Sequence, residues 1–480
     1  MTVQNPSSLI KIFGVCTALL YAVLMVASRG YGDVTLALAA MVYGAATAIV
    51  LVLVLVLAQT SQPPRDAIGW LLAFAVLFRL LGVCTFPVLE DDFYRYLWDG
   101  RMVVETWQPY GTAPALWFDN ESISDGFVEI LDGINYPWVA TVYGPTLQLW
   151  YALGYAVAPG EVWPLQLVAA VADLGVLLVL VKLCAGRSAL LFGGWVLYAW
   201  SPLLIKEFAT TAHPDVMGAF FVVLALLLYC RERWFWLGVC LGLATGVKPF
   251  ALVIAPFLIA LRWRAMLGFA SAIGLLSAPF LLAQQTLEAI WLPEGLRAMG
   301  DDWLFNAPLY LLAFEWQSWL VALGLTAAAV KPVLLGSFTL LWLWQLARWL
   351  LAEMAAQPQA GQVASQHLFA ARLARLGELP LVWLIGVFLL VLPALNPWYL
   401  VWWLPFAVLK LRGQQWVTPW VASIALGLSY VTGINLSGNA GLGLYEIPGA
   451  VVALEFSLIA AAVGWDLWRA HSARTSALPT

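Results

Sequence analysis

Three carboxylates in a row, Glu90, Asp91 and Asp92, follow directly on a long apolar stretch. Like charges this close disfavour joint ionisation and raise the pKa of one carboxyl, and apolar surroundings act in the same direction. A carboxylate with a raised pKa is a candidate general base. The same run also suits a solvated helix start, because Asp is favoured at the N-cap and in the first helical turn. The residues alone leave both interpretations open.

Cations and rings follow this acidic run and recur in later segments that we place on the same side of the membrane. If the chain beyond Asp92 is helical, Arg95 and Asp99 share a face with it by the 3.6-residue repeat. The other residues of this kind are Arg101, Lys206, His213, Lys248 and Tyr399. A lone Lys or His in a loop is usually just solvated, but several cations opposite paired carboxylates can hold an anionic group. The pattern predicts an anion site beside a general base.

The energy for any reaction has to come with the substrate. The sequence has no Walker loop, no GxGxxG after a strand, no HExxH and no GxSxG. ATP is therefore not hydrolysed on this chain, and an enzyme of this kind needs an activated substrate such as a lipid-linked phosphosugar. The five cysteines lie in or beside apolar stretches and form no CxxC, so we expect neither a disulfide nor a metal site from them.

Transmembrane helices must position these residues, because 63% of the 480 residues are apolar and only 10% are charged. Soluble domains are about 25% charged. Runs of about 20 apolar residues, enough to cross a bilayer, recur along the chain. We expect an all-α polytopic membrane protein with about 13–14 spans. They are placed near 12–28, 36–58, 68–87, 165–183, 189–206, 216–230, 235–262 (two short spans), 266–283, 331–350, 380–395, 398–411, 417–434 and 448–469.

Polar segments divide the chain into three expected regions. Residues 1–67 form an N-terminal extension of two spans. Residues 68–283 form a catalytic core with an outer loop at 88–164, and residues 284–480 form a C-terminal membrane region. This last region carries an outer loop at 284–306 and a cytoplasmic loop at 351–379, and the short apolar segments 143–158 and 307–317 are expected to lie as helices on the outer membrane face.

Lys and Arg set the orientation, because they accumulate on the cytoplasmic side of membrane proteins. With the N-terminus inside, fifteen of the 23 Lys and Arg fall on the inner side and seven on the outer side, while Arg79 falls within a span. We therefore expect both termini in the cytoplasm and the segment 88–164 outside. The net charge of -4 gives no reason to expect a nucleic-acid partner.

Two charged residues are expected within the membrane. Arg79 and Asp173 each lie eight residues below the outer end of a span, which is about 12 Å deep at 1.5 Å per residue. A charge at that depth is costly and usually pairs or faces a cavity. Since the two spans flank the outer loop, we predict an ion pair between them. The alternative is that each residue binds a different partner or a backbone carbonyl.

The stretch from Phe78 to Pro145 resembles bacterial membrane glycosyltransferases of the GT-C superfamily, in particular the mannosyltransferase-like members that use polyprenyl-phosphate sugars. The motifs are Glu90-Asp91-Asp92, Tyr94 to Arg101, Pro109-Tyr110, Ala113-Pro114, Tyr136-Pro137 and Tyr143-Gly144-Pro145, with weaker matches at His213-Pro214-Asp215, Gly242 to Pro249 and Asn396 to Tyr399. The chain departs from the usual Gly-x-Asn-Pro-Tyr, Tyr-Pro-Pro and His-Asn-Asp at Thr106 to Tyr110, Tyr143 to Pro145 and His213 to Asp215. These departures bear on the sugar and the acceptor and not on the fold.

The resemblance implies roles for the candidate residues. Asp91 or Asp92 would deprotonate the acceptor hydroxyl, and a single displacement would invert the anomeric centre. The departing polyprenyl phosphate would be bound by a donor site of Arg95, Asp99, Arg101, Lys206, His213, Lys248 and Tyr399. The scheme requires no cofactor and no metal, although a carboxylate pair could hold one. The expected partners are the lipid-linked donor, an unidentified glycan, lipid or protein acceptor, and membrane lipid.

Two other functions fit parts of the sequence. A transporter or flippase of lipid-linked saccharides would explain the spans, but such proteins often show inverted repeats and broken helices at mid-membrane. No internal repeat is visible here, and the polar residues gather at the outer edge. A non-catalytic scaffold for envelope synthesis is the third interpretation. The favoured one is an enzyme of the bacterial inner membrane with its active site on the extracytoplasmic side.

Overall fold

The computed structural model describes residues 6–29, 36–57, 65–184, 188–302, 304–315, 327–356, 365–409, 417–431 and 447–475, and the statements below concern these residues. Helices and turns make up this part of the chain, which contains no strand beyond an isolated bridge between Phe305 and Ala394. Long apolar runs favour helices in lipid because a helix satisfies its own backbone hydrogen bonds. The all-α prediction is confirmed.

Eight described helices are long and apolar enough to cross a membrane, or nine if one bent pair counts as a span. They are Ser7–Arg29, Leu36–Leu57, Asp66–Val83, Trp163–Leu183, Trp263–Leu282, Ala329–Ala355, Leu368–Leu390 and Gly449–Ser472. The chain is therefore polytopic, as predicted, but these candidates are fewer than the expected 13–14. Of the other predicted spans, 216–230 is one helix of 16 residues, Asp215–Cys230. Turns at Pro and Gly near 249, 397 and 427 divide the apolar runs there into shorter helices.

The first part of the chain forms three long helices and then a segment of shorter ones. The long helices are α1 (Pro6–Arg29), α2 (Leu36–Leu57) and α3 (Arg65–Val83). The shorter ones are α4 (Asp92–Thr106), the 3-10 helix η1 (Pro114–Trp117), α5 (Asp125–Asp132) and α6 (Pro145–Val157). Helix α6, expected to lie on the membrane surface, packs against α4 and also contacts α11 and α7.

The central helices form the wall behind this segment. They are α7 (Trp163–Leu183), α8 (Ser188–Ala199), α9 (Pro202–Leu204), the π-helix η2 (Ile205–Thr210), α10 (Asp215–Cys230), α11 (Trp234–Val247), the 3-10 helix η3 (Pro249–Val253), α12 (Ala255–Ile259) and α13 (Trp263–Leu282). Glycines bring α11 and α13 into backbone contact. A Cβ on Gly238 would lie 1.9 Å from the Ala265 carbonyl oxygen, and one on Gly268 would lie 2.0 Å from that of Phe235. Small residues allow such close packing in membranes.

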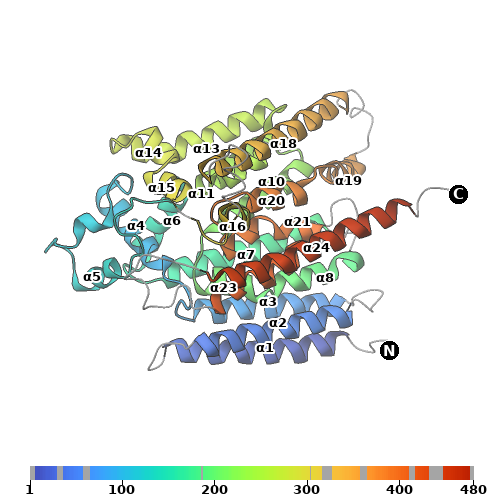
Figure 1. Cartoon of the computed structure of the whole chain (residues 1–480), viewed down its shortest axis with the longest axis horizontal. Coiled ribbons are helices and arrows are strands. Elements are labelled where there is room, and N and C mark those ends of the chain that lie inside the picture. Colours follow the sequence, from blue (N-terminus) through green and yellow to red (C-terminus); the bar gives the residue numbers. More distant parts are fainter. Residues whose placement is uncertain are drawn as a thin grey trace.

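The remaining elements complete the bundle. They are α14 (Leu287–Trp291), α15 (Glu294–Asp302), α16 (Pro308–Glu315), α18 (Ala327–Ala356), α19 (Ser365–Leu376), α20 (Leu381–Leu390), the 3-10 helix η5 (Pro397–Trp402), α21 (Leu404–Leu409), α22 (Thr418–Ala425), α23 (Leu428–Val431) and α24 (Gly449–Thr475). Figure 1 shows α4, α5, α6, α14 and α15 at one end of the long helices. The start of α1 and the end of α24 lie towards the other end.

The predicted intramembrane ion pair is confirmed. Arg79 Nε and Nη2 donate to Asp173 Oδ2 at 2.9 and 2.7 Å, and both side chains are at most 1% exposed. Tyr198 donates to the second carboxylate oxygen at 2.8 Å, and Arg79 Nη1 donates to the carbonyls of Ala75 and Ala199. The pair therefore ties α3 to α7, and its further bonds bring in α8. Every nitrogen and oxygen of the two charged groups has a partner.

Candidate functional site

A cavity of about 520 Å³ lies where the short helices meet the central wall. Segments far apart in the chain line it: the start of α4, the segment before α6, the start of α10, the end of α11 with the turn after it, α14 and α15, residues 304–305, and the turn before η5. The charged, amide, hydroxyl and phenol side chains that line the cavity are Glu90, Asp91, Asp92, Arg95, Tyr96, Asn135, Tyr136, Tyr143, Asp215, Thr245, Lys248, Asn396 and Tyr399. The cavity therefore combines carboxylates with cations.

Unusual backbone conformations position these side chains at the cavity. Leu89, just before the acidic run, has a φ of 64°, and Ala212, just before His213, has a φ of 58°. Residues without the freedom of glycine adopt this region only at a cost in free energy, and such strain clusters at functional sites. The chain also passes through the π-helix η2 and bends by 116° between Thr210 and Asp215. This break turns His213 and Asp215 towards the α4 segment.

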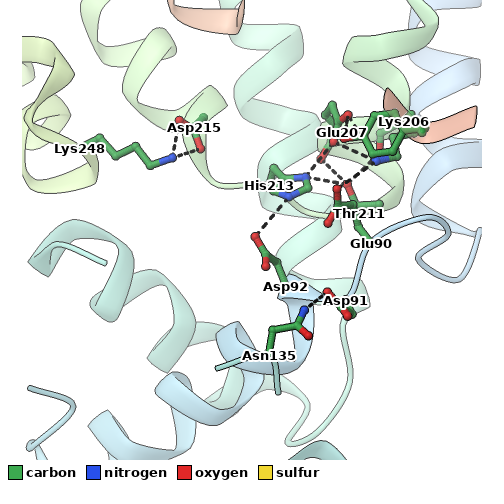
Figure 2. Close-up of polar contacts among 11 residues, drawn as sticks. Glu90, Asp91, Asp92, Asn135, Lys206, Glu207, Thr211, His213, Asp215 and Lys248 are labelled. Atoms are coloured by element: carbon green, nitrogen blue, oxygen red, sulfur yellow. Dashed lines mark hydrogen bonds and ion pairs between the residues drawn. The ribbon is translucent and has the colours of Figure 1, made fainter. Parts of the chain in front are cut away.

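Asp91 is the N-cap of α4, yet its side chain makes no capping hydrogen bond. Its carboxylate instead accepts a hydrogen bond from the Asn135 side chain and lines the cavity (Figure 2). Burial raises the pKa of Asp91 to about 7, and the charge of Asp92 acts in the same direction. Of the two interpretations left open by the sequence, the plain helix cap does not describe this side chain. A carboxyl with a pKa near 7 can accept a proton at neutral pH.

Asp92 faces His213, which is fully buried. His213 Nε2 lies 3.6 Å from Asp92 Oδ2, while Nδ1 lies 2.9 Å from Glu207 Oε2 and 2.9 Å from the Thr211 hydroxyl. The ring stacks on Trp398 with 3.9 Å between centroids. Burial alone would lower the pKa of His213, but the carboxylates of Asp92 and Glu207 outweigh it and raise the pKa to about 9.

Glu90 and Lys206 lie deeper than the two aspartates (Figure 2). Lys206 Nζ is 3.3 Å from Glu207 Oε2 and 3.9 Å from Glu90 Oε1, and it sits 3.7 Å from the ring centroid of Tyr430. Burial raises the pKa of Glu90 to about 8, although Lys206 opposes the shift. Lys206 is only 3% exposed and is not among the residues that line the cavity.

Lys248 and Asp215 form a second polar group on the opposite side of His213 (Figure 2). Lys248 Nζ donates to both oxygens of Asp215 at 2.9 and 2.8 Å, and Trp402 Nε1 donates to one of them at 2.9 Å. The ammonium also lies 4.0 Å from the ring centroid of Tyr399. Burial acts to lower the pKa of Lys248, but Asp215 outweighs it, so the pKa is raised and the side chain stays charged.

Arg95 contributes the other cation that lines the cavity from α4. Its Nε donates to Asp99 Oδ1 at 2.9 Å, and Nη1 donates to the Val139 carbonyl at 2.9 Å. Asp99 itself is 1% exposed and also accepts from the side chains of Thr141 and Gln148. Asp99 therefore fixes the direction of Arg95 and does not reach the cavity.

The candidate residues thus separate into three positions. Asp91, Asp92, Arg95, Lys248 and Tyr399 line the cavity. His213, Lys206 and Asp99 lie behind it and contact the lining residues. Arg101 pairs with Glu105 at 2.9 Å and lies 4.9 Å from the ring centroid of Phe127, away from the lining residues.

Asn135 is the site residue that the sequence analysis did not single out. It is the partner of Asp91, and it stands directly before the Tyr136-Pro137 motif. Tyr136 has a φ of 52°, so the backbone here is also strained. The nearby motif was a signal, but an Asn in a polar loop is too common to be chosen on residue type alone.

One group could hold a metal ion. Ligand atoms of Glu90, Asp92 and His213 lie within 4.8 Å of one another. Among the described residues, no other group of three or more His, Cys, Asp or Glu side chains has its ligand atoms this close together.

The fold and the cavity define a polytopic helical membrane protein with carboxylates and cations gathered at one end of its long helices. Residues 14–264 match the family model described as alpha-(1->6)-mannopyranosyltransferase, N-terminal domain. The chain belongs to this mannosyltransferase family and is a membrane glycosyltransferase. No curated protein and no solved structure matches the chain significantly. The matched residues contain the acidic run, His213 and Lys248.

Proposed function

We propose that the protein transfers a hexose, with mannose the first candidate, from a polyprenyl-phosphate donor to an acceptor hydroxyl on the extracytoplasmic face. One observation carries the proposal: Asp91, Arg95 and Lys248 line the same cavity. A base and two cations are what displacement of a phosphate by a hydroxyl requires. The sugar follows from the family, whose described activity is mannosyl transfer.

Asp91 is the proposed general base. Asp92 faces the buried His213, which competes for its carboxylate, whereas Asp91 contacts the neutral amide of Asn135. The pKa of Asp91, about 7, lies close to an ordinary working pH, where a general base is most effective. Asp91 would take the proton of the acceptor hydroxyl as its oxygen attacks the anomeric carbon. The bond to the phosphate oxygen breaks on the opposite side, so the configuration inverts.

Arg95 and Lys248 would bind the donor phosphate and stabilise it as it leaves. Arg can form two parallel hydrogen bonds with a phosphate, and Lys provides a point charge. The Tyr399 ring contacts the Lys248 ammonium, and Asp99 accepts a hydrogen bond from Arg95. A phosphate leaves without protonation, so the scheme needs no general acid. Lys206 and His213 lie behind the lining residues, where they would position Glu90 and Asp92.

The proposed orientation puts the cavity on the extracytoplasmic side. The cavity-bearing segment lies at the end of the helices away from the first residue of α1 and the last residue of α24 (Figure 1). With those two ends in the cytoplasm, as the distribution of Lys and Arg favours, the cavity opens outside. Lipid-linked donors present their phosphate at such a surface.

The decisive test is a transfer assay on the purified chain in lipid nanodiscs. Polyprenyl-phosphate mannose and polyprenyl-phosphate glucose, each radiolabelled in the sugar, are supplied separately with a mannoside acceptor. Label is expected to move to the acceptor from the mannose donor. Transfer from a nucleotide sugar alone, or no transfer from any lipid-linked donor, would contradict the proposal. A flippase would move label across the bilayer of a vesicle without joining it to the acceptor.

A further inference from the structure

The group formed by Glu90, Asp92 and His213 contains two buried polar atoms without a hydrogen-bond partner. These atoms are Glu90 Oε1 and His213 Nε2. His213 is 0% and Glu90 is 7% exposed, so water does not reach them freely. Buried polar atoms normally have a hydrogen-bond partner, so an atom without one indicates a bound water or ion. Both of these atoms belong to the same three-residue group, whose ligand atoms lie within 4.8 Å.

The ring of His213 is held in the manner of a metal ligand. Its Nδ1 faces Glu207 at 2.9 Å, and the ring stacks on Trp398. A histidine that binds a metal usually donates its other N–H to a carboxylate, which fixes the tautomer and aims the free nitrogen. Here Nδ1 lies 2.9 Å from both Glu207 Oε2 and the Thr211 hydroxyl, and Nε2 faces Asp92 (Figure 2). Because the pKa of His213 is about 9, an ion that binds at Nε2 displaces a proton from the ring.

The separation of the ligand atoms also suits an ion. Nε2 of His213 and Oδ2 of Asp92 are 3.6 Å apart, which is longer than an N–H···O hydrogen bond. Two ligands at about 2.05 Å from a tetrahedral ion are about 3.3 Å apart. A small side-chain movement therefore brings both atoms into coordination, with Glu90 Oε1 as the third ligand.

Charge balance points in the same direction. Three carboxyl groups, those of Glu90, Asp92 and Glu207, surround His213, and Lys206 lies 3.9 Å from Glu90 and 3.3 Å from Glu207. Arg95 and Lys248 are each already paired with another carboxylate. The phosphate of the proposed donor would bring further negative charge. A divalent ion would add to the positive charge that Arg95 and Lys248 present to it.

We infer that Glu90, Asp92 and His213 bind a divalent transition-metal ion, with Glu207 orienting the imidazole. One imidazole and two carboxylates suit Zn²⁺ or Mn²⁺ better than Ca²⁺ or Mg²⁺, which prefer oxygen ligands alone. The binding of the ion stands on the geometry. Its role in transfer, which is to offset the charge of the donor phosphate, rests on the proposed function.

The test measures metal binding directly. Metal-stripped protein in nanodiscs is titrated with Zn²⁺ and with Mn²⁺ in separate calorimetric experiments, without donor or acceptor. One ion per chain is expected to bind. Asp92→Asn and His213→Gln should each weaken binding at least tenfold. Glu207→Gln should weaken it about 10- to 100-fold although Glu207 does not touch the ion. Asp91→Asn, the matched control between two ligands, should bind as the wild type does.

Co²⁺ gives a second readout that a loss of folding does not imitate. Its visible absorption reports the ligands, so His213→Gln should change the spectrum whereas Asp91→Asn should leave it unchanged. Thermal melting of the metal-free variants shows that each one folds. No binding to the wild type, or binding that His213→Gln and Asp92→Asn leave unchanged, would overturn the inference. Because neither experiment contains a sugar donor, failure of the metal site is separate from failure of the proposed function.

Discussion

Two groups of buried charges lie near each other in the chain and differ in how completely they are paired. In the helix layer, all five charged nitrogens and oxygens of Arg79 and Asp173 are hydrogen-bonded. At the end of the helices, Glu90, Asp91, Asp92 and His213 line or support a cavity, and two of their atoms have no partner. Unpaired buried polar groups are costly, so they persist where a ligand completes them. The contrast distinguishes a structural ion pair from the proposed ligand site.

Breaking the fully paired group, Arg79 and Asp173, should produce the largest effect, which is a loss of stability. Arg79→Leu or Asp173→Leu leaves a buried charge without its partner, at a cost of about 3–5 kcal/mol. The double variant should recover part of that loss, because no unpaired charge remains. Thermal melting of the four proteins in one detergent forms the cycle. Strictly additive losses would show that the two residues do not stabilise each other.

A change in the incompletely paired group at the cavity should instead reduce turnover. Asp91→Asn keeps the shape of the side chain but removes the base, so turnover should fall about a hundredfold or more. The melting temperature should stay close to that of the wild type, since Asp91 forms no capping bond. Asp125→Asn, on the exposed start of α5, is the matched control and should keep full activity. Wild-type turnover in the Asp91 variant would remove this residue from the mechanism.

The cation that lines the cavity should affect donor binding more mildly. Lys248→Ala is expected to weaken binding of polyprenyl-phosphate mannose about tenfold, in keeping with the loss of one charge-assisted contact. Lys331→Ala, in α18 and outside the cavity lining, should change it little. Lys248→Arg keeps the charge and should restore part of the affinity. Equal donor affinities for the two Ala variants would contradict the assigned phosphate site.

Orientation can be tested without changing stability or activity. A cysteine at Asp125 should react with a membrane-impermeant maleimide in intact cells, because the segment 88–164 is expected outside. A cysteine at Arg231, an exposed residue between α10 and α11, should react only after permeabilisation. The wild type supplies the background, since Cys16 and Cys84 are exposed. The opposite pattern of labelling would place the cavity in the cytoplasm.

Much of the fold was accessible from the sequence because lipid enforces simple rules. Apolar runs must be helices, and seven of the predicted spans coincide with helices long enough to cross a membrane. The span predicted at 380–395 overlaps the second half of an eighth such helix, Leu368–Leu390, which begins inside the predicted cytoplasmic loop 351–379. Depth along two of these spans was sufficient to predict the pair of Arg79 and Asp173. Composition does not reveal where a helix breaks, so several predicted spans correspond to shorter helices in the described part of the chain. The bend between Thr210 and Asp215 and the short pieces after Lys248 are examples.

The acidic run and its chemistry were also readable from the sequence, since residue type and close spacing decide the repulsion among Glu90, Asp91 and Asp92. What each residue faces depends on segments far away in the chain, and only the tertiary structure decided it. Asn135 binds Asp91, Glu207 fixes His213, and Asp215 pairs with Lys248. Such contacts arise from strained turns and a broken helix that bring distant segments together. Local sequence determines which groups can react, whereas packing determines which of them remain unpaired and free to bind a ligand.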